Sequence, residues 1–264
     1  MKNVLLLSFI VACLIGCTQG ARNNAEEPEK WIQLFNGKDL TGWTVKIRNY
    51  PVGENFGNTF YVEDSILKVK YDAYGDNFDQ RYGHIYTNDS YSDYKLRVEY
   101  RFVGEQAPGG EGWAWRNSGA MLHCPDPATM ALDQDFPVSI EAQMLGGDGT
   151  NERHTGNVCT PGTEVFLKGE LYPGHCYESI SKTYHGDQWV TLEVVVYHDS
   201  IVHHIMEGDT ILTYTNLRVG GGNVSPKPNI PEGPLKSGRI SLQSESHPVE
   251  FRKVELLDLS KKKK

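Results

Sequence analysis

Most of the chain consists of short runs in which apolar and polar residues alternate. In YKLRVEYRFV, Leu96, Val98, Tyr100 and Phe102 alternate with charged residues, the pattern of a strand with one buried face and one face in water. Comparable runs are FYVEDSILKVK, GHIYTN, SGAMLHC, PVSIEAQML, QWVTLEVVVY, IVHHIMEGDTILTYTNL, GRISLQSE and VEFRKVELLDL. Helical periodicity is scarce, with room for one or two turns between residues 127 and 133. The pattern predicts an all-β sandwich or barrel of roughly nine or more short strands.

The polar residues between and within these runs predict local detail. Turns are expected at Glu63-Asp64, at His198-Asp199 and at Gly208-Asp209. The alternation in VEFRKVELLDL slips near Lys253, which predicts a β-bulge there.

The run SIEAQML places a carboxylate and an amide on the same face of a strand. Residues two apart in a strand share a face, so Glu141 and Gln143 point one way while Ile140, Ala142 and Met144 point the other. In a sandwich with a curved sheet, we expect the apolar set between the sheets and the polar set on the wet, concave face.

The N-terminus, MKNVLLLSFIVACLIGC, predicts export. Lys2 supplies a positive charge near its start, and the apolar run that follows is short for a membrane span but typical of a signal peptide. Leu14-Ile15-Gly16-Cys17 resembles the lipobox of bacterial lipoproteins, in which the cysteine is lipidated and becomes the mature N-terminus. We therefore expect a lipid anchor in the membrane at Cys17 and a place in the cell envelope, on the periplasmic or outer-membrane face. The alternative is an ordinary signal peptide with a chance cysteine.

Composition adds a domain organisation and excludes one class of partner. No linker or shift in composition divides the 264-residue chain after residue 31, and the net charge of −8 argues against nucleic-acid binding. The expected parts are a signal peptide (1–16), a lipidated tether (17–30), a single sandwich domain (31–260) and a basic tail (261–264).

Of the five cysteines, three remain after the signal peptide and Cys17 are set aside. Cys159 and Cys176 flank one loop segment and form the natural disulfide pair, which would contribute about 3 kcal/mol in the chain-entropy model. The alternative is two reduced, separately buried cysteines. Cys124 would be the odd thiol. Zinc ligation is not favoured, because no C-x-x-C spacing occurs.

The order of motifs resembles a known family. WIQLFNGKDLTGW, RNSG, SIEAQ, HTGNV, WVTLEVVVY and GRISLQSESHPVEFRKVELLDL follow one another between about residues 31 and 259. This order is similar to that of the 3-keto-disaccharide hydrolase domain family, also described as 3-keto-glucoside 1,2-lyase and 3-keto-2-hydroxyglucal hydratase. The resemblance implies a concanavalin A-like jelly-roll sandwich, often on an exported lipoprotein. The chain departs from the family at residues 242–247, where "LQ-HG" is usual, and in the insertion between Cys159 and Cys176, and both departures leave the substrate open.

The residues favour one of two glycoside-cleaving chemistries. Paired-acid hydrolysis needs two carboxylates, but the position two beyond Glu141 is the amide Gln143, and nothing in the sequence brings Asp133 or Asp135 to it. A 3-keto sugar needs a single base, because its ketone acidifies the C2 hydrogen and lets the glycosidic oxygen leave by β-elimination. Water then adds back. We expect Glu141 to be the base or its orienter, and Gln143 to hydrogen-bond the sugar.

Further candidates lie in the motifs around this strand. His154 in a loop is the second acid–base candidate, and Arg116, Asn117, Trp113 and Trp115 are expected to bind substrate. Each has a structural alternative: an exposed loop histidine, a surface cation, a turn former, or tryptophans that fill the sheet edge.

Two other classes of function stay open at this stage. A non-catalytic, lectin-like module would use the same tryptophans and amides, and an envelope interaction domain would use only the scaffold. A strongly raised pKa at Glu141 in a cleft would favour the enzyme, since a lectin needs no buried base. The expected partner is a 3-keto sugar or glycoside. No cofactor or metal ligand set is predicted, and the involvement of a divalent ion is left open.

Overall fold

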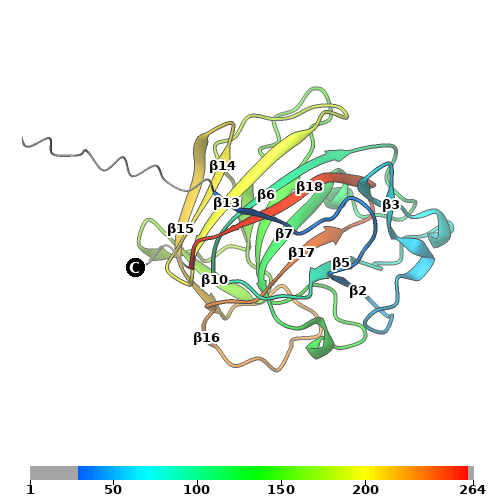
Figure 1. Cartoon of the computed structure of the whole chain (residues 1–264). Helices are drawn as coiled ribbons and strands as arrows, with labels where there is room; N and C mark the ends of the chain where they lie inside the picture. Colours follow the sequence, from blue (N-terminus) through cyan, green and yellow to red (C-terminus); the bar gives the residue numbers. More distant parts are fainter. Residues whose placement is uncertain (1–28, 261–264) are drawn as a thin grey trace, which may run out of the picture.

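The computed structural model describes residues 29–260, which fold into two antiparallel β-sheets packed face to face (Figure 1). The predicted all-β jelly-roll sandwich is confirmed. The predicted signal peptide, Cys17, most of the predicted tether and the basic tail lie outside the described residues.

The larger sheet has eleven strands and the smaller has seven. In order across the larger sheet they are β11 (Glu170–Leu171), β10 (Thr163–Leu167), β15 (Asp209–Val219), β14 (Ile201–Met206), β13 (Val190–Tyr197), β6 (Asp93–Phe102), β18 (Val249–Asp258), β4 (Ile66–Val69) and β3 (Phe60–Glu63), with β1 (Trp31–Gln33) on β18 and β16 (Gly233–Pro234) on β15. Across the smaller sheet they are β12 (Cys176–Tyr177), β9 (Asn157–Cys159), β8 (Ile140–Leu145), β7 (Asn117–Cys124), β17 (Arg239–Ser244), β5 (Gly83–Thr87) and β2 (Trp43–Ile47). The helices of the described part are single 3-10 turns: η1 (Phe56–Asn58), η2 (Asp72–Tyr74), η3 (Gly112–Ala114) and η4 (Pro127–Thr129).

Alternation along the strands places the core between the sheets. Leu96, Val98 and Tyr100 of β6 are buried there, together with Ile140, Ala142 and Met144 of β8, as the sequence predicts. The charged residues of β6 lie on the outer face of the larger sheet, where they form ion pairs with β13 and β18. These pairs are partly buried: the side chain of Glu255 is 8% exposed, and that of its partner Arg97 is 28% exposed.

Local predictions hold with two shifts of one residue. The β14–β15 turn is centred on Glu207 and Gly208, both with positive φ, one residue earlier than expected. The register of β18 against β6 changes between Phe251 and Lys253, so the predicted bulge is present. The β3–β4 turn is centred on Asp64 and Ser65, both with positive φ, one residue later than expected. The segment predicted to hold a helical turn contains η4.

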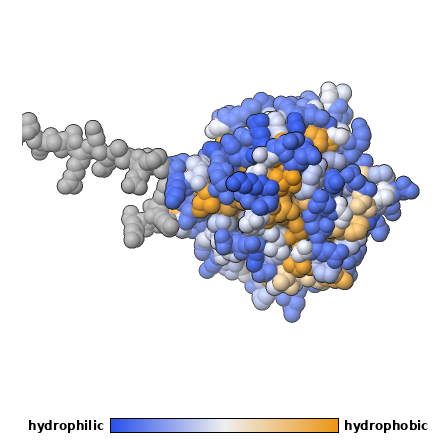
Figure 2. All heavy atoms as spheres, turned by 45° about the vertical axis from the view of Figure 1, so that its right-hand side comes forward, coloured by the Kyte–Doolittle hydropathy of each residue, from blue (hydrophilic) through white to orange (hydrophobic). Residues whose placement is uncertain are grey.

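Hydrophilic residues cover most of the face in Figure 2, and hydrophobic ones form a broken band across its middle. Within residues 29–260, no helix has the length and apolar character needed to cross a membrane.

Candidate active site

The free face of the smaller sheet carries a row of polar side chains in register across six strands. The row consists of five polar residues and one glycine, in the order Asn157, Gln143, Gly119, Gln243, His84 and Lys46. A sheet face that packed against a core would be apolar here, so this face is built for something other than packing.

A cavity of about 620 Å³ opens over the β9, β8 and β7 end of this row. Its volume suits a ligand of one or two sugar rings. Glu141 and Gln143 line it from β8 and Asn117 lines it from β7. Glu245, the first residue after β17, lines it as well.

Among the strand residues that line the cavity, Glu141 is the one whose pKa is shifted. Glu141 is only 6% exposed, and its Oε1 atom has no hydrogen-bond partner. Apolar neighbours on the same face, including Met121 directly across on β7, form a small buried cluster with Tyr86 and Met130. Burial raises the pKa of the Glu141 carboxyl to about 8, because the low dielectric disfavours its charged form.

Gly119 makes room for this carboxyl. A Cβ atom built on Gly119 would lie 2.6 Å from Oε1 of Glu141 and 2.9 Å from its Cδ. The Glu141 side chain therefore lies flat across β7, toward β17, in a space that any other residue at position 119 would fill. Glycine is required here for a close approach, and RNSG carries it.

Gln143 is oriented by its neighbour on β9. Asn157 Nδ2 donates to Gln143 Oε1 at 3.0 Å, and Asn157 is held in turn by the amide of Ser179, which donates to its Oδ1 at 2.9 Å. With its carbonyl oxygen engaged, Gln143 presents its amide nitrogen as a donor to the cavity.

A second buried carboxylate shares the cavity, and this corrects the expectation of a single acid. Glu245 is 3% exposed; its Oε1 accepts from Gln243 Nε2 at 2.8 Å and its Oε2 has no partner. Burial, then repulsion from Glu141 and Glu111, raises the pKa of the Glu245 carboxyl well above its usual value, and Arg153 opposes the rise. The residues that the sequence offered as partners do not fill this role: Asp133 is exposed, and Asp135 Oδ1 accepts from two backbone amides at the rim.

Sequence reasoning missed Glu245 although a signal was present. GRISLQSE carries Gln243 and Glu245 two apart on one face, the reverse of the Glu141 and Gln143 order. Both strands flank β7, so the two polar pairs meet across it. That β8 and β17 lie on either side of β7 is a feature of the tertiary structure, and alternation along the sequence does not predict it.

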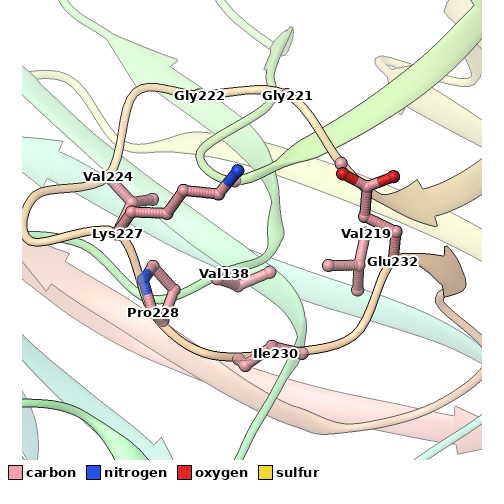
Figure 3. A pocket seen from close by; sticks show the side chains of 11 residues that line it. Val138, Val219, Gly221, Gly222, Val224, Lys227, Pro228, Ile230 and Glu232 are labelled. Atoms are coloured by element: carbon pink, nitrogen blue, oxygen red, sulfur yellow. The ribbon is translucent and has the colours of Figure 1, made fainter.

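The loop between β15 and β16 forms one wall of the cavity through residues 223–225. The Ser225 amide donates to Asp135 Oδ1 at 2.8 Å, and the Asp135 amide donates to the Ser225 carbonyl at 2.9 Å. Beyond Ser225, the loop continues through Ile230, arches around Val138 and borders a void of about 30 Å³ (Figure 3). A void of that size holds no sugar, so the larger cavity is the candidate site.

The structure brings together some of the predicted binding residues and not others. Asn117 lines the cavity with its Oδ1 unpartnered, and Trp113 stands at the rim, 52% exposed. Trp115, Arg116 and His154 do not line it.

Each of these three residues has another environment. Trp115 faces a neighbouring cavity and packs against His247. Arg116 pairs with Asp187 at 2.8 Å, and the Nδ1 atom of His154 contacts the Ser181 carbonyl.

Arg153, which the sequence did not single out, organises the segment that carries these tryptophans. Its guanidinium donates to the carbonyls of Trp115 at 2.6 Å, Gly146 at 2.9 Å, and Trp113 and Arg116 at 3.2 Å each. The charge of Arg153 is thereby committed to backbone oxygens near the acids.

The disulfide that the sequence proposed is present and forms part of the cavity wall. Cys159 on β9 and Cys176 on β12 are directly paired and bonded, and Cys124 is a buried free thiol. Among residues 29–260, no group of three or more His, Cys, Asp or Glu side chains is arranged to hold a metal ion.

Comparison with known proteins places this site in a family. Two solved structures from Parabacteroides distasonis ATCC 8503, each named as a candidate glycosyl hydrolase, share the fold. One is 17% identical with a TM-score of 0.51, covering 87% of this chain and 100% of its own. The other is 20% identical with a TM-score of 0.51, covering 87% and 94%. No curated protein matches the sequence. The model of the 3-keto-alpha-glucoside-1,2-lyase-like domain matches residues 30–257, nearly the whole described part, so the chain belongs to this carbohydrate-related family.

Proposed function

We propose that the protein cleaves 3-keto-glycosides by removing the C2 proton and expelling the glycosidic oxygen, after which water adds to the resulting double bond. The observation that carries the proposal is Glu141: a buried carboxyl with an unpartnered oxygen, in a sugar-sized cavity. The family membership supports the ketone-bearing substrate.

The pKa of Glu141 suits the abstraction of a proton from carbon. A carboxylate whose pKa is raised to about 8 is a far stronger base than an ordinary glutamate. The enolate that forms carries its charge on the C3 oxygen and needs a donor close by. Gln143, whose amide nitrogen faces the cavity, is the donor that the site holds ready.

The buried acid argues against a purely lectin-like role. A sugar-binding site gains nothing from keeping a carboxyl without a hydrogen-bond partner, since that arrangement costs on the order of 1–3 kcal/mol. Catalytic sites commonly contain such groups.

A second candidate function follows from the pair of acids. Glu141 and Glu245 in one cavity supply the two carboxyls that ordinary glycoside hydrolysis requires. That reaction needs no ketone, so the two functions differ in substrate.

The test is paired substrates in deuterated water. We expect a 3-keto-glucoside to be cleaved with deuterium incorporated at C2, the parent glucoside to be left intact, and the rate to rise with pH as Glu141 ionises. Glu141→Gln keeps the shape and removes the base, so it should lower the rate about 10²–10⁴-fold. Equal cleavage of the parent glucoside without deuterium at C2 would establish paired-acid hydrolysis instead, and binding without turnover of either sugar would establish the lectin-like role.

A further inference from the structure

Elimination needs a proton for the departing oxygen as well as a base for C2, and the second acid in the cavity is placed to supply it. Glu245 follows β17, and Gly119 lets the Glu141 carboxyl lie across β7 in its direction. Both carboxyls line the same cavity, both belong to residues more than nine-tenths buried, and each has one oxygen without a partner.

The charges around Glu245 do not permit both acids to ionise together. The titratable groups that act on its carboxyl are Glu141 from β8, Glu111 from the segment before η3 and Arg153 from the loop before β9; Tyr71 and Tyr82 lie near as neutral phenols. Arg153 is the one cation among them, and its guanidinium is engaged by backbone carbonyls. Two buried like charges with so little compensation retain a proton between them.

The environments of the two acids differ in the way that separates an acid from a base. The repulsion between Glu141 and Glu245 acts on both carboxyls, but repulsion from Glu111 acts on Glu245 in addition to its burial. The additional repulsion from Glu111 favours the shared proton on Glu245, which leaves Glu141 as the group that ionises.

We propose that Glu245 is the general acid of the reaction, which protonates the glycosidic oxygen as that oxygen leaves C1. This assignment rests on the proposed elimination, and it makes Glu245 a catalytic residue that the sequence did not reveal.

Every proton that Glu141 and Glu245 give or take during the reaction can be accounted for. The Glu141 carboxylate takes the C2 proton, and the C–H electrons form the enolate, whose charge lies on the C3 oxygen. The enolate then collapses: its electrons become the C1=C2 double bond, the C3 ketone re-forms, and the C1–O bond breaks as Glu245 gives its proton to the leaving oxygen. Glu141 is then protonated and Glu245 ionised. On hydration, Glu245 accepts a proton from the water whose oxygen adds to C1, and Glu141, whose proton exchanges with solvent while the double bond stands, delivers a proton to C2. The pair ends with the one proton that it held at the start.

Leaving groups of different acidity test the assignment. The substrates are the methyl 3-keto-glucoside, whose alkoxide needs protonation, and the 4-nitrophenyl 3-keto-glucoside, whose phenolate departs unaided. For Glu245→Gln in the full chain, we expect kcat/KM to fall about 10²–10⁴-fold on the methyl substrate and less than about tenfold on the nitrophenyl one. Exchange of the C2 hydrogen with deuterated water should persist, and the alkaline limb of the wild-type pH profile should disappear. Glu141→Gln should lower exchange and both cleavages, each about 10²–10⁴-fold.

Two controls separate this role from a structural one. Glu63→Gln makes the same chemical change at the exposed end of β3 and should leave both rates unchanged. His175 also lines the cavity, and a loss confined to the methyl substrate in His175→Gln, with Glu245→Gln unaffected, would overturn the assignment. Equal losses on both substrates in Glu245→Gln, or none, would overturn it too. If the wild type neither cleaves a 3-keto-glucoside nor exchanges its C2 hydrogen, the proposed elimination fails first and the role of Glu245 falls with it.

Discussion

At the scale of single residues, burial without a partner distinguishes Glu141 from the exposed acids among residues 29–260. Exposed carboxylates such as Asp39 and Glu63 have their pKa lowered by hydrogen bonds from Asn36 and Lys68 respectively. Glu141 has no such donor, and its pKa moves the other way. Proton transfer near neutral pH requires such a raised pKa. Burial of the carboxyl that raises it also lowers the free energy of unfolding.

That cost predicts a pH-dependent stabilisation in Glu141→Gln. Below the ordinary glutamate pKa both the folded and the unfolded protein hold the proton, so burial carries no ionisation penalty. As the pH rises toward about 8, the unfolded chain releases the proton more readily, and the free energy of unfolding falls until Glu141 ionises in the folded state as well. The amide removes this penalty. We expect Glu141→Gln to be more stable than the wild type by on the order of 1–4 kcal/mol near pH 9 and by much less near pH 4.

Urea unfolding of both proteins at the two pH values measures this difference. A gap that is the same at both, or larger in acid, would show that the Glu141 pKa is not raised by folding. Glu63→Gln, where Glu63 pairs with Lys68 at the surface, should show no such gain at alkaline pH.

At the scale of elements, the site depends on which strands are neighbours. β8 and β17 flank β7 from opposite sides. β8 carries Glu141 and Gln143 two residues apart, and β17 carries Gln243, with Glu245 directly after the strand. β9 adds Asn157, which orients Gln143. β12 closes this edge of the sheet through the disulfide with β9.

The Cys159–Cys176 disulfide should matter for stability more than for chemistry. It closes a segment with a sequence separation of 17 residues, and its removal in the Cys159→Ser/Cys176→Ser double variant is expected to cost about 3 kcal/mol in the chain-entropy model. Because the disulfide lines the cavity, KM should rise more than kcat falls.

Thiol counting provides the check on its presence. Denatured, unreduced protein that begins at residue 23 should contain one reactive thiol, Cys124. Three reactive thiols would mean that the bridge does not form.

At the scale of the whole molecule, the sandwich is a rigid support with its chemistry on the free face of the smaller sheet. The larger sheet turns a face of ion pairs outward, such as Lys95 with Glu193 and Arg101 with Glu250. The proposed base Glu141 lies on a strand, and the ladder of backbone hydrogen bonds holds such a group to a narrower range of positions than a mobile loop would.

The N-terminal segment predicts how this body is held in the cell envelope. We propose that Cys17 is lipidated and that the tether connects the sandwich to a membrane. Cells fed a fatty-acid probe should label the wild-type protein and leave Cys17→Ala unlabelled. Equal labelling of the two would assign the segment to an ordinary signal peptide.

Alternation along the chain by itself determined the fold class and the face on which Glu141 and Gln143 lie, because a strand side chain has only two directions and burial selects one of them for the apolar set. The bulge near Lys253 was readable for the same reason, as a break in a period of two. Which strands adjoin which was decided only by the tertiary structure. Glu141 and Glu245 are separated by a hundred residues of chain and joined by the order β8-β7-β17, and Gly119 matters only because a carboxyl from the next strand lies over it. Strand pairing is set by the packing of the entire sandwich, so the second acid, its protonation and the cavity that both acids share exist only in the folded protein.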